Sequence, residues 1–489
     1  MQKFLVFLVS ISSVFLIADT SYAALEDDSS LQNELIYYVL VDRFTNGTAE
    51  NDGDIDIEDP SAYHGGDIQG VISNLNHIKE LGFTTINLSP VMSNGAEGYH
   101  GFLIDDHRLV EEHFGSMEEL AQLVEEAHKL DLKVVLDFVV SHVGPNHESL
   151  TNNSDWLANT TTFDGNEYPS PDLSNEMVKQ YFFDSAAFWI NETGIDGYRL
   201  YMNENTPSTF INEFTDAVQS IDSDFFVIGE VINSNQGFKS DELTIDALVN
   251  DQIHSRLSDI FSSYGNSIEP LLKEWPNNTN LTNGLYLDSH ETIRFTREVV
   301  KQKQNPITRW KLGLTFLYTT PGVPIVYQGS EVPMDNGEDS PDHRMTQING
   351  GDDELQQHIE QLAAIRKQFP SLVYGKLDLV ESIGAMTMYK REYQGKVVYV
   401  AINNDTKTKS ITIKDVPEGM QLTGLLQDNI VREKNNGEYK ITLDRETADI
   451  YIVEEDTGLN WLFITFVVLV LGGFVGGVTY LSIKNKRQQ

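Results

Sequence analysis

The strongest constraint on the fold is an alternation of short apolar runs and longer amphipathic stretches that repeats over about 330 residues. The apolar runs are rich in Val, Ile, Leu and Tyr without alternating with polar residues, which is typical of parallel strands buried on both faces. Repeated units of this kind predict an α/β fold, a (β/α)8 barrel whose chemistry lies on the loops that follow the strands. The predicted strands are Ile36–Val41, Thr85–Leu88, Lys133–Val139, Gly197–Leu200, Phe225–Ile228, Leu285–Asp288 and Ile325–Tyr327, and the predicted helices include Ile72–Leu81, Met117–Leu130, Asn175–Glu192 and Leu355–Gln368.

The pattern changes from about Leu377 to strands in which apolar and polar residues alternate. Turn signals such as Gln394–Gly395 and Asn436–Gly437 separate these strands. The sequence therefore predicts a small all-β domain after the barrel. Its predicted strands are Met386–Arg391, Lys396–Asn403, Ser410–Ile413, Tyr439–Leu443 and Ala448–Val453.

Both ends of the chain carry segments that predict where the protein is located in the cell. Met1–Ala23 has a basic residue, an apolar run and a small-x-small ending, which predicts a secretory signal peptide; an uncleaved anchor is the alternative. Trp461–Ile483 is uncharged and apolar, and it is long enough to cross a hydrocarbon core of about 30 Å. Basic residues follow it, so we expect one transmembrane helix, an extracellular ectodomain and a cytoplasmic tail at 484–489.

Composition excludes several classes of function. The chain has 34 Lys and Arg against 74 Asp and Glu, a formal net charge of -40, so it repels phosphate backbones and no nucleic acid partner is expected. It has no Cys, which removes disulfides, thiolate catalysis and thiolate metal sites. Any metal site must use carboxylate, His or carbonyl ligands.

Charged residues in specific local patterns stand at or just after four predicted strands, where a barrel presents its active site. These segments are Asp137–His142, Gly194–Arg199, Phe226–Glu230 and Asp288–Glu291, and further matching segments are His64–Asp67, Leu81–Phe83, Asn87–Pro90, Tyr99–Gly101 and Pro321–Tyr327. Together they resemble the α-amylase family of retaining glycoside hydrolases, family 13. The resemblance extends from about residue 36 to about residue 453.

The resemblance implies a division into domains. A TIM-type barrel, domain A, would comprise 24–142 and 172–375, with a short domain B inserted at 143–171. A C-terminal β-sandwich would comprise 376–455. Residues 456–460 would link it to the membrane segment 461–483, and residues 1–23 would be the signal peptide.

The resemblance also implies catalytic roles, and here the sequence departs from the family. Family chemistry needs two carboxyl groups about 5–5.5 Å apart, a nucleophile and an acid/base, with a third carboxylate nearby. The acid/base matches Glu230, and the arginine that orients the nucleophile matches Arg199. The nucleophile position, however, is occupied by Tyr201, and the third carboxylate is Glu291 in place of Asp.

Several substrate-binding positions of the family are retained. These are His100, His142, His290 and Arg344, whereas Phe102 stands where the family has a stacking Tyr. Other neighbours differ: the family has Trp at Leu103, Asn at Ser141 and Lys-His at Glu204–Asn205.

Three interpretations of Tyr201 remain open. In the first interpretation hydrolysis is weak or lost, because a phenol with an unperturbed pKa near 10 is a poor nucleophile. In the second, Tyr201 acts as a nucleophile beside a carboxylate, as tyrosine does in sialidases. In the third, Glu291 is the nucleophile and Glu230 the acid in an active glycosidase or transglycosidase.

The resemblance implies calcium as well. Asn46, Thr48, Asn51, Asp52, the carbonyl near Gly65 and Asp67 resemble an N-terminal calcium loop, with the oxygen ligands that Ca²⁺ prefers. A polar turn that binds nothing is the alternative. A second family site would use Ser141, Asp172 and the Asn205 carbonyl, and it is weakened by the loss of Asn at Ser141.

The expected ligand, by this resemblance, is an α-glucan or maltooligosaccharide, bound or cleaved at the cell surface. A scaffold or partner subunit of another membrane protein is a further hypothesis. It is suggested by the single-span amylase-like subunits of amino-acid transporters, although those carry their span before the barrel.

Overall fold

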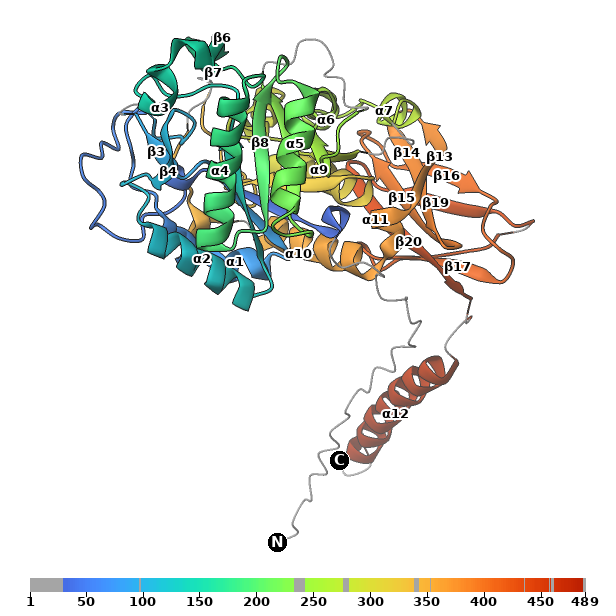
Figure 1. Ribbon diagram of the computed structural model, residues 1–489. Helices are drawn as coiled ribbons and strands as arrows, with labels where there is room; N and C mark the ends of the chain where they lie inside the picture. The colour runs from blue at the N-terminus through green and yellow to red at the C-terminus, as the bar shows by residue number, and fades with distance from the viewer. Residues whose placement is uncertain are drawn as a thin grey trace.

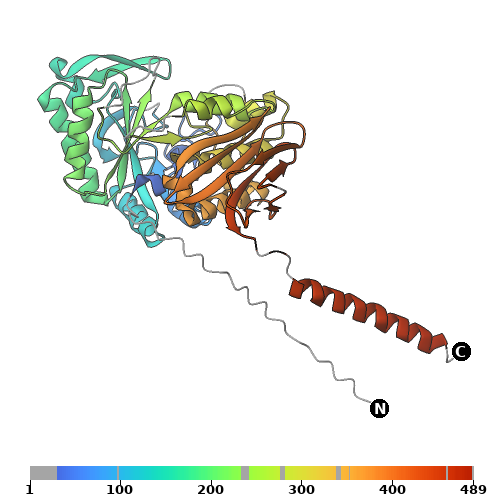
Figure 2. The same ribbon diagram turned by 90° about the vertical axis from the view of Figure 1, so that its right-hand side faces the viewer.

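The computed structural model describes residues 30–95, 98–232, 242–275, 281–337, 343–351, 353–434, 436–456, 458 and 461–486. The predicted signal peptide therefore lies outside the described residues. Figures 1 and 2 show a barrel beside a β domain, with the last helix standing apart from both.

Eight parallel strands close into a barrel in the order β1-β12-β11-β10-β9-β8-β5-β2, which confirms the predicted barrel. Its interior is filled by side chains such as Tyr38, Phe226 and Ile325, so it is a packed core. The strands are β1 (Ile36–Val39), β2 (Thr85–Leu88), β5 (Lys133–Val139), β8 (Gly197–Asn203), β9 (Phe226–Ile232), β10 (Ala247–Val249), β11 (Thr282–Leu285) and β12 (Val323–Tyr327).

Helices cover the outside of the barrel (Figure 1). Their starts follow local chemistry: the Asp67 side chain accepts the Gly70 amide at the start of α1, and Ser116 and Glu119 form a capping box on α2. The helices are α1 (Ile68–Glu80), α2 (Met117–Lys129), α3 (Glu148–Thr151), α4 (Glu176–Thr193), α5 (Ser208–Gln219), α6 (Asp251–Phe261), α7 (Glu269–Lys273), α8 (Phe295–Lys301), α9 (Pro306–Thr319), α10 (Asp353–Gln368) and α11 (Pro370–Tyr374).

Two barrel strands differ from the sequence expectation. β10 was not predicted, because three residues are too short to show a period. β11 ends at Leu285, whereas the predicted strand began there. The run that follows is apolar because Tyr286 and Leu287 are buried beyond the end of the strand ladder, so burial and not strand pairing produced the pattern.

Two hairpins follow β2 and β5, and Figure 1 shows one of them at the top of the molecule and the other at its left side. One pairs β3 (Met92–Asn94) with β4 (Ile104–Val110). The other pairs β6 (Leu157–Phe163) with β7 (Asn166–Pro171) and lies within the segment predicted as domain B. The exact domain boundaries stay predictions.

The C-terminal part is a β-sheet domain, as predicted. Its strands form a sheet of order β13-β14-β15-β20-β17-β18 and a pair β16-β19. Gln394 and Gly395 both adopt positive φ in the tight turn between β14 and β15, as the turn signal indicated. The strands are β13 (Lys376–Ile383), β14 (Met386–Tyr393), β15 (Lys396–Asn403), β16 (Lys409–Ile413), β17 (Met420–Gly424), β18 (Ile430–Arg432), β19 (Tyr439–Leu443) and β20 (Thr447–Glu455).

The last helix, α12, spans Trp461–Lys486. Crossing a bilayer requires about 20 largely apolar residues in one helix. Within the described ranges of the chain, no helix meets the length and apolarity that a membrane crossing needs. The prediction of a single-pass membrane protein with an extracellular ectodomain is thereby contradicted, and the predicted transmembrane segment, membrane tether and membrane-protein partner lose their support.

Candidate functional site

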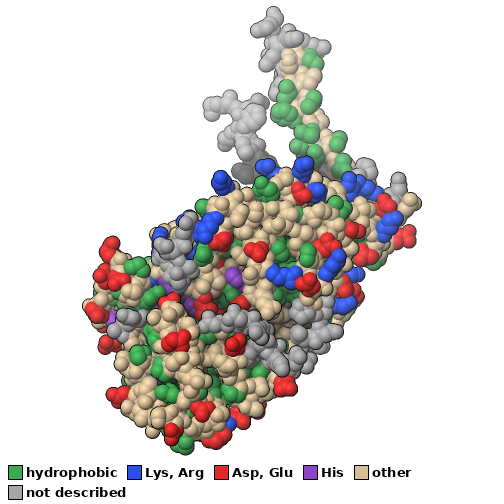
Figure 3. Space-filling model, turned by 90° about the horizontal axis from the view of Figure 1, so that it is seen from above, with side chains coloured by type: hydrophobic (Ala, Val, Ile, Leu, Met, Phe, Trp, Pro, Cys, Tyr) green, Lys and Arg blue, Asp and Glu red, His purple; other side chains and the backbone are tan. Residues whose placement is uncertain are grey.

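A cavity of about 290 Å³ lies among the loops at the carboxyl ends of the barrel strands. Figure 3 shows this end of the molecule from above, with acidic side chains spread over it and histidine side chains showing between them. The cavity brings together four of the predicted site residues, His100, Phe102, His290 and Glu291, and its other described lining residues are Tyr99, Phe163, Asp164, Gly165, Ile232 and His343.

The stacked rings of Phe102 and His290 form the floor of the cavity. Phe102 lies flat against His290, with ring centroids 4.9 Å apart and planes 4° from parallel. On another side its ring centroid is 4.7 Å from that of Tyr201. Because Tyr201 does not line the cavity, the Phe102 ring separates it from the open space.

Glu230 and Arg199 lie beneath this floor and form a buried ion pair. Arg199 donates through both Nε and Nη2 to one carboxylate oxygen of Glu230. Its guanidinium also lies over the Tyr38 ring, 4.6 Å from the centroid, and 3.7 Å from Asp137 Oδ2. Burial raises the pKa of Glu230 to about 7, although Arg199 opposes that rise. Neither residue reaches the cavity.

Tyr201 is fully buried near the end of β8. Its backbone is tied to the end of β5, because its carbonyl accepts the Val140 amide at 2.9 Å. Among the residues that the structure describes, the Tyr201 hydroxyl has no hydrogen-bond partner. A buried hydroxyl without a partner costs about 1–3 kcal/mol, and none of the described residues is placed to accept its proton.

Glu291 and Asp164 are the two acidic residues among the described lining of the cavity, and Glu291 is the one beside the floor residue His290. About a third of its side chain, 35%, is exposed, yet the loss of water around the carboxyl raises its pKa to about 7. Its carboxyl oxygen lies 4.0 Å from His290 Nε2. Both ring nitrogens of His290 are buried without a hydrogen-bond partner in the described part of the chain.

His100 and His142 are buried in the neutral form. Burial lowers the pKa of His100 to about 3 and that of His142 to about 4. His100 Nδ1 accepts the Phe102 amide at 3.0 Å, and Ser141 Oγ lies 2.9 Å from His142 Nδ1. These bonds orient both rings beside the cavity without charge, which suits recognition of neutral hydroxyl groups.

We expect His100→Asn to lose less stability than the wild type as the pH falls. The unfolded chain protonates this histidine below about pH 6.5, whereas the folded protein resists protonation down to about pH 3, so wild-type stability declines as the pH falls through that window. Asn keeps an acceptor for the Phe102 amide and does not titrate. Urea unfolding at pH 7.5 and at pH 5 measures the difference, and an equal loss in both proteins would contradict the assignment.

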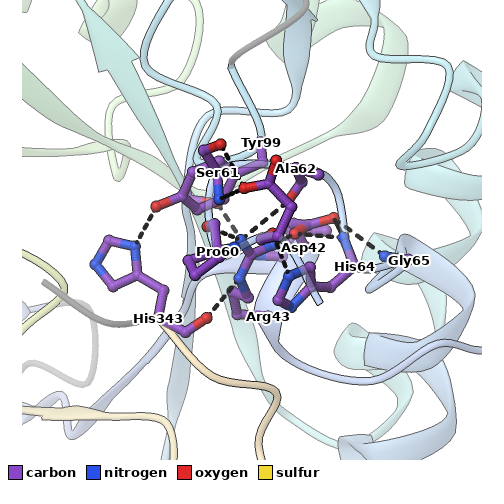
Figure 4. A network of polar contacts seen from close by, with 12 residues as sticks. Asp42, Arg43, Pro60, Ser61, Ala62, His64, Gly65, Tyr99 and His343 are labelled. Atoms are coloured by element: carbon purple, nitrogen blue, oxygen red, sulfur yellow. Dashed lines mark hydrogen bonds and ion pairs between the residues drawn. The ribbon is translucent and has the colours of Figure 1, made fainter. Parts of the chain in front are cut away.

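One wall of the cavity is held by Arg43 (Figure 4). Its guanidinium lies over the Tyr99 ring at 3.9 Å, and its Nε donates to the His343 carbonyl at 2.5 Å. The Tyr99 hydroxyl lies 2.9 Å from His343 Nδ1, and His343 Nε2 donates to the His290 carbonyl. His343 Nε2 must be the donor in the second contact, because a carbonyl oxygen only accepts. This chain of contacts fixes the floor residue His290 from behind.

The opposite wall is the tip of the β6–β7 hairpin. Phe163 stacks on His142, with centroids 4.7 Å apart. Asp164 and Gly165 both have positive φ in the two-residue turn that follows it. The pattern Thr-Thr-Phe-Asp-Gly-Asn-Glu-Tyr at 161–168 contains an Asp-Gly hairpin signal, which could have revealed this wall from the sequence.

The predicted site residues thus divide into two groups. His100, Phe102, His290 and Glu291 line the cavity, and His142 lies behind Phe163. Glu230, Arg199 and Tyr201 lie below the floor. Arg344 is exposed and does not line the cavity, which its neighbour His343 reaches instead. Tyr99, Phe163 and His343 were not predicted as site residues.

The N-terminal polar loop brings its predicted calcium ligands close together. Asn46 Nδ2 donates to Asp52 Oδ1 at 2.7 Å, and a Cβ at Gly65 would lie within 3.0 Å of both side chains. Asp67 is occupied by the amides of Gly47, Thr48 and Gly70. In the described residues Asn51 Oδ1 is buried without a partner. These oxygens are of the kind that Ca²⁺ accepts, since it takes amide and carbonyl ligands. The described part of the chain, however, contains no group of three or more His, Asp or Glu that could hold a metal.

Comparison with family models decides the family. A model of the alpha amylase catalytic domain matches residues 38–162 and 145–372, and a model of the alpha-amylase C-terminal domain matches residues 375–451. The chain belongs to the alpha-amylase family. The resemblance carried by the strand-end motifs is thus confirmed at the level of the family.

Individual members of the alpha-amylase family agree with this. The chain is similar to a crystal structure of an Anoxybacillus alpha-amylase, with 42% identity and a TM-score of 0.83 over 88% of this chain and 100% of that one. It is also similar to the Geobacillus thermoleovorans alpha-amylase solved with acarbose, with 37% identity and a TM-score of 0.80 over 88% of this chain and 100% of that one. A Paenibacillus polymyxa beta/alpha-amylase is 28% identical over 466 residues, which cover 88% of this chain and 38% of that protein. This chain therefore spans under half the length of that relative.

Proposed function

We propose that the protein binds an α-glucan or maltooligosaccharide in the 290 Å³ cavity and that its hydrolysis is weak or lost. The family membership and the acarbose complex of one relative support the sugar class. The observation that carries the loss of activity is the buried, unpartnered Tyr201 beneath the Phe102 ring, at the position where the family has its nucleophile.

The surroundings of Tyr201 support the same conclusion. Arg199, which by the resemblance would orient a nucleophilic Asp, is instead paired with Glu230. An acid/base must come within about 2.6–3.2 Å of the proton it transfers, and Glu230 is held away from the cavity by its ion pair and by the ring floor. A sugar resting on Phe102 would contact His290 and Glu291 without reaching Glu230.

One observation favours a second candidate, an active glycosidase that uses Glu291. This carboxyl lines the cavity, and a pKa of about 7 leaves part of it ionised at neutral pH. It would need Glu230 to act as the acid across the ring floor. The two candidates differ in whether Glu230→Gln changes turnover.

Binding is tested by calorimetric titration of the purified full chain with maltoheptaose. We expect saturable binding that weakens at least tenfold in His290→Ala, because His290 lines the cavity and its ring supports the Phe102 face. The matched control is His128→Ala, since His128 pairs with Asp196 on the outside of the barrel. The proposed function would be contradicted if the wild type gave no heat of binding with maltoheptaose and if maltose showed no competition with it.

We also propose that the loop formed by Asn46, Thr48, Asn51, Asp52, Gly65 and Asp67 holds Ca²⁺. The ion would supply a structural link between the loop and α1. Calcium is expected to raise the thermal midpoint of the wild type, because a ligand that binds only the folded state stabilises it by about 2.7 kcal/mol at 100 times its Kd.

This stabilisation by calcium should disappear in Asp52→Ala and persist in the control Asp172→Asn. Differential scanning fluorimetry with calcium and with EDTA gives the comparison. Equal midpoints of the wild type in both conditions would contradict the calcium proposal.

A further inference from the structure

Side chains from both strands of the β6–β7 hairpin converge on one backbone carbonyl of the segment that follows β5, that of Ser141, and the Pro169 carbonyl of β7 also accepts the Val143 amide at 3.0 Å. Thr161 Oγ1 donates to the Ser141 oxygen at 3.0 Å and Ser170 Oγ at 2.9 Å, one from each strand of the hairpin. Asn203 Nδ2, at the end of β8, adds a longer contact of 3.4 Å and donates to Thr161 Oγ1 at 2.9 Å. We call Ser141, Thr161, Ser170 and Asn203 the hairpin hub.

The hub occupies the place where the resemblance implied a second calcium site, and its contacts do not fit a cation. A carbonyl oxygen has two lone pairs, and both are taken by the two hydroxyl donors. Ser141 Oγ faces His142, and Asp172 Oδ1 accepts both the amide and the hydroxyl of Ser174. The neighbouring cavity of about 190 Å³ contains one carboxylate, Asp172, among its described lining residues, and its other side-chain oxygens are the uncharged ones of Asn, Ser and Thr.

The hub also lies directly behind the sugar cavity. Ser141 directly precedes His142 in the chain. Thr161 lies two residues before Phe163 on β6, so the side chains of Thr161 and Phe163 face the same side of that strand. Phe163 stacks on His142 and lines the cavity with its turn residues Asp164 and Gly165. A shift of the hub would therefore move this wall against the floor.

We propose that the hydrogen bonds of the hairpin hub hold the hairpin against the barrel in place of a bound cation. We also propose that Thr161 and Ser170 are positioning residues for the Phe163 wall. The joint then needs no metal. The positioning part rests on the proposed sugar binding, whereas the metal-independent joint does not.

Hydrogen exchange of the full chain, followed by mass spectrometry, tests both parts. In the wild type, the exchange rate of peptides covering 157–171, measured relative to that of peptides from α2, should be the same with and without EDTA. Thr161→Val with Ser170→Ala should speed that exchange at least tenfold, because both donors to the Ser141 carbonyl are removed without a change of shape. The control Thr160→Val removes a hydroxyl that bonds to Glu167 within the hairpin and should leave the joint intact.

Two results would overturn the proposal: EDTA opening the hairpin of the wild type, or unchanged exchange in the double variant. If the double variant does not fold, each single variant should show an intermediate increase, and no increase in either would overturn it equally. Maltoheptaose affinity should fall about tenfold in the folded variant and not in Thr160→Val. If the wild type binds no sugar, the proposed function fails while the exchange result still decides the nature of the joint.

Discussion

Tyr201→Asp should raise the release of reducing ends from maltoheptaose at least about 100-fold over the wild type. The substitution replaces a phenol by a carboxylate that is ionised at neutral pH. It also offers Arg199 a third acidic partner beside Glu230 and Asp137, and it removes the ring packed against Phe102, which opens the floor toward Glu230. A gain of about 100-fold corresponds to about 2.7 kcal/mol of transition-state stabilisation. A reducing-sugar assay of the purified full chain measures it.

The matched control is Tyr201→Phe, which keeps the ring and removes only the hydroxyl. It should bind maltoheptaose as the wild type does and gain no activity. A wild type that is already active and is inactivated by Tyr201→Phe would show that Tyr201 is itself the nucleophile. A Tyr201→Asp variant that folds, binds sugar and stays inactive would show that more than the nucleophile has been lost.

The second large effect concerns stability. Arg391→Ala should lower the free energy of unfolding by about 3–5 kcal/mol, because it removes a buried cation from the joint between barrel and β domain. Arg391 is fully buried and donates to the carbonyls of Thr319 at 2.7 Å, Gly375 at 3.0 Å and Val373 at 3.2 Å. Truncation leaves three carbonyl oxygens without their donor and an empty space. Urea unfolding, followed by tryptophan fluorescence and circular dichroism, measures the loss.

Arg432→Ala provides the comparison. Arg432 is partly exposed on β18 and pairs with Asp456 at 2.9 Å, so its removal should cost less than about 1 kcal/mol. Similar losses in the two variants would contradict the role of Arg391 in joining the domains.

Pattern in the sequence predicted the barrel because strands buried on both faces leave long apolar runs. It predicted β14 and β15 because their alternation is bounded by a Gly-containing turn. It missed β10, where three residues carry no period, and it displaced β11, where burial continues past the ladder. The spacing of apolar residues indicates which residues are buried. It indicates strand pairing only where the buried residues also pair with a neighbouring strand.

The site was predicted in part, since motifs identify residues without giving their depth. His290 and Glu291 are adjacent in the chain and both reach the cavity, as expected. Arg199 was expected beside the bound sugar, and it lies below the ring floor because it pairs with Glu230. The Asp164–Gly165 signal indicates the hairpin that carries Phe163, but it does not show that this hairpin folds over His142.

The most direct test of the central claim measures binding and turnover together on the wild-type full chain and on Glu230→Gln. Calorimetry with maltoheptaose gives affinity, and reducing-end release from the same preparations gives turnover. The account predicts saturable binding in both proteins, with turnover that is negligible or very low and does not fall in Glu230→Gln. Clear turnover in the wild type that vanishes in Glu230→Gln would contradict it and establish a working glycosidase.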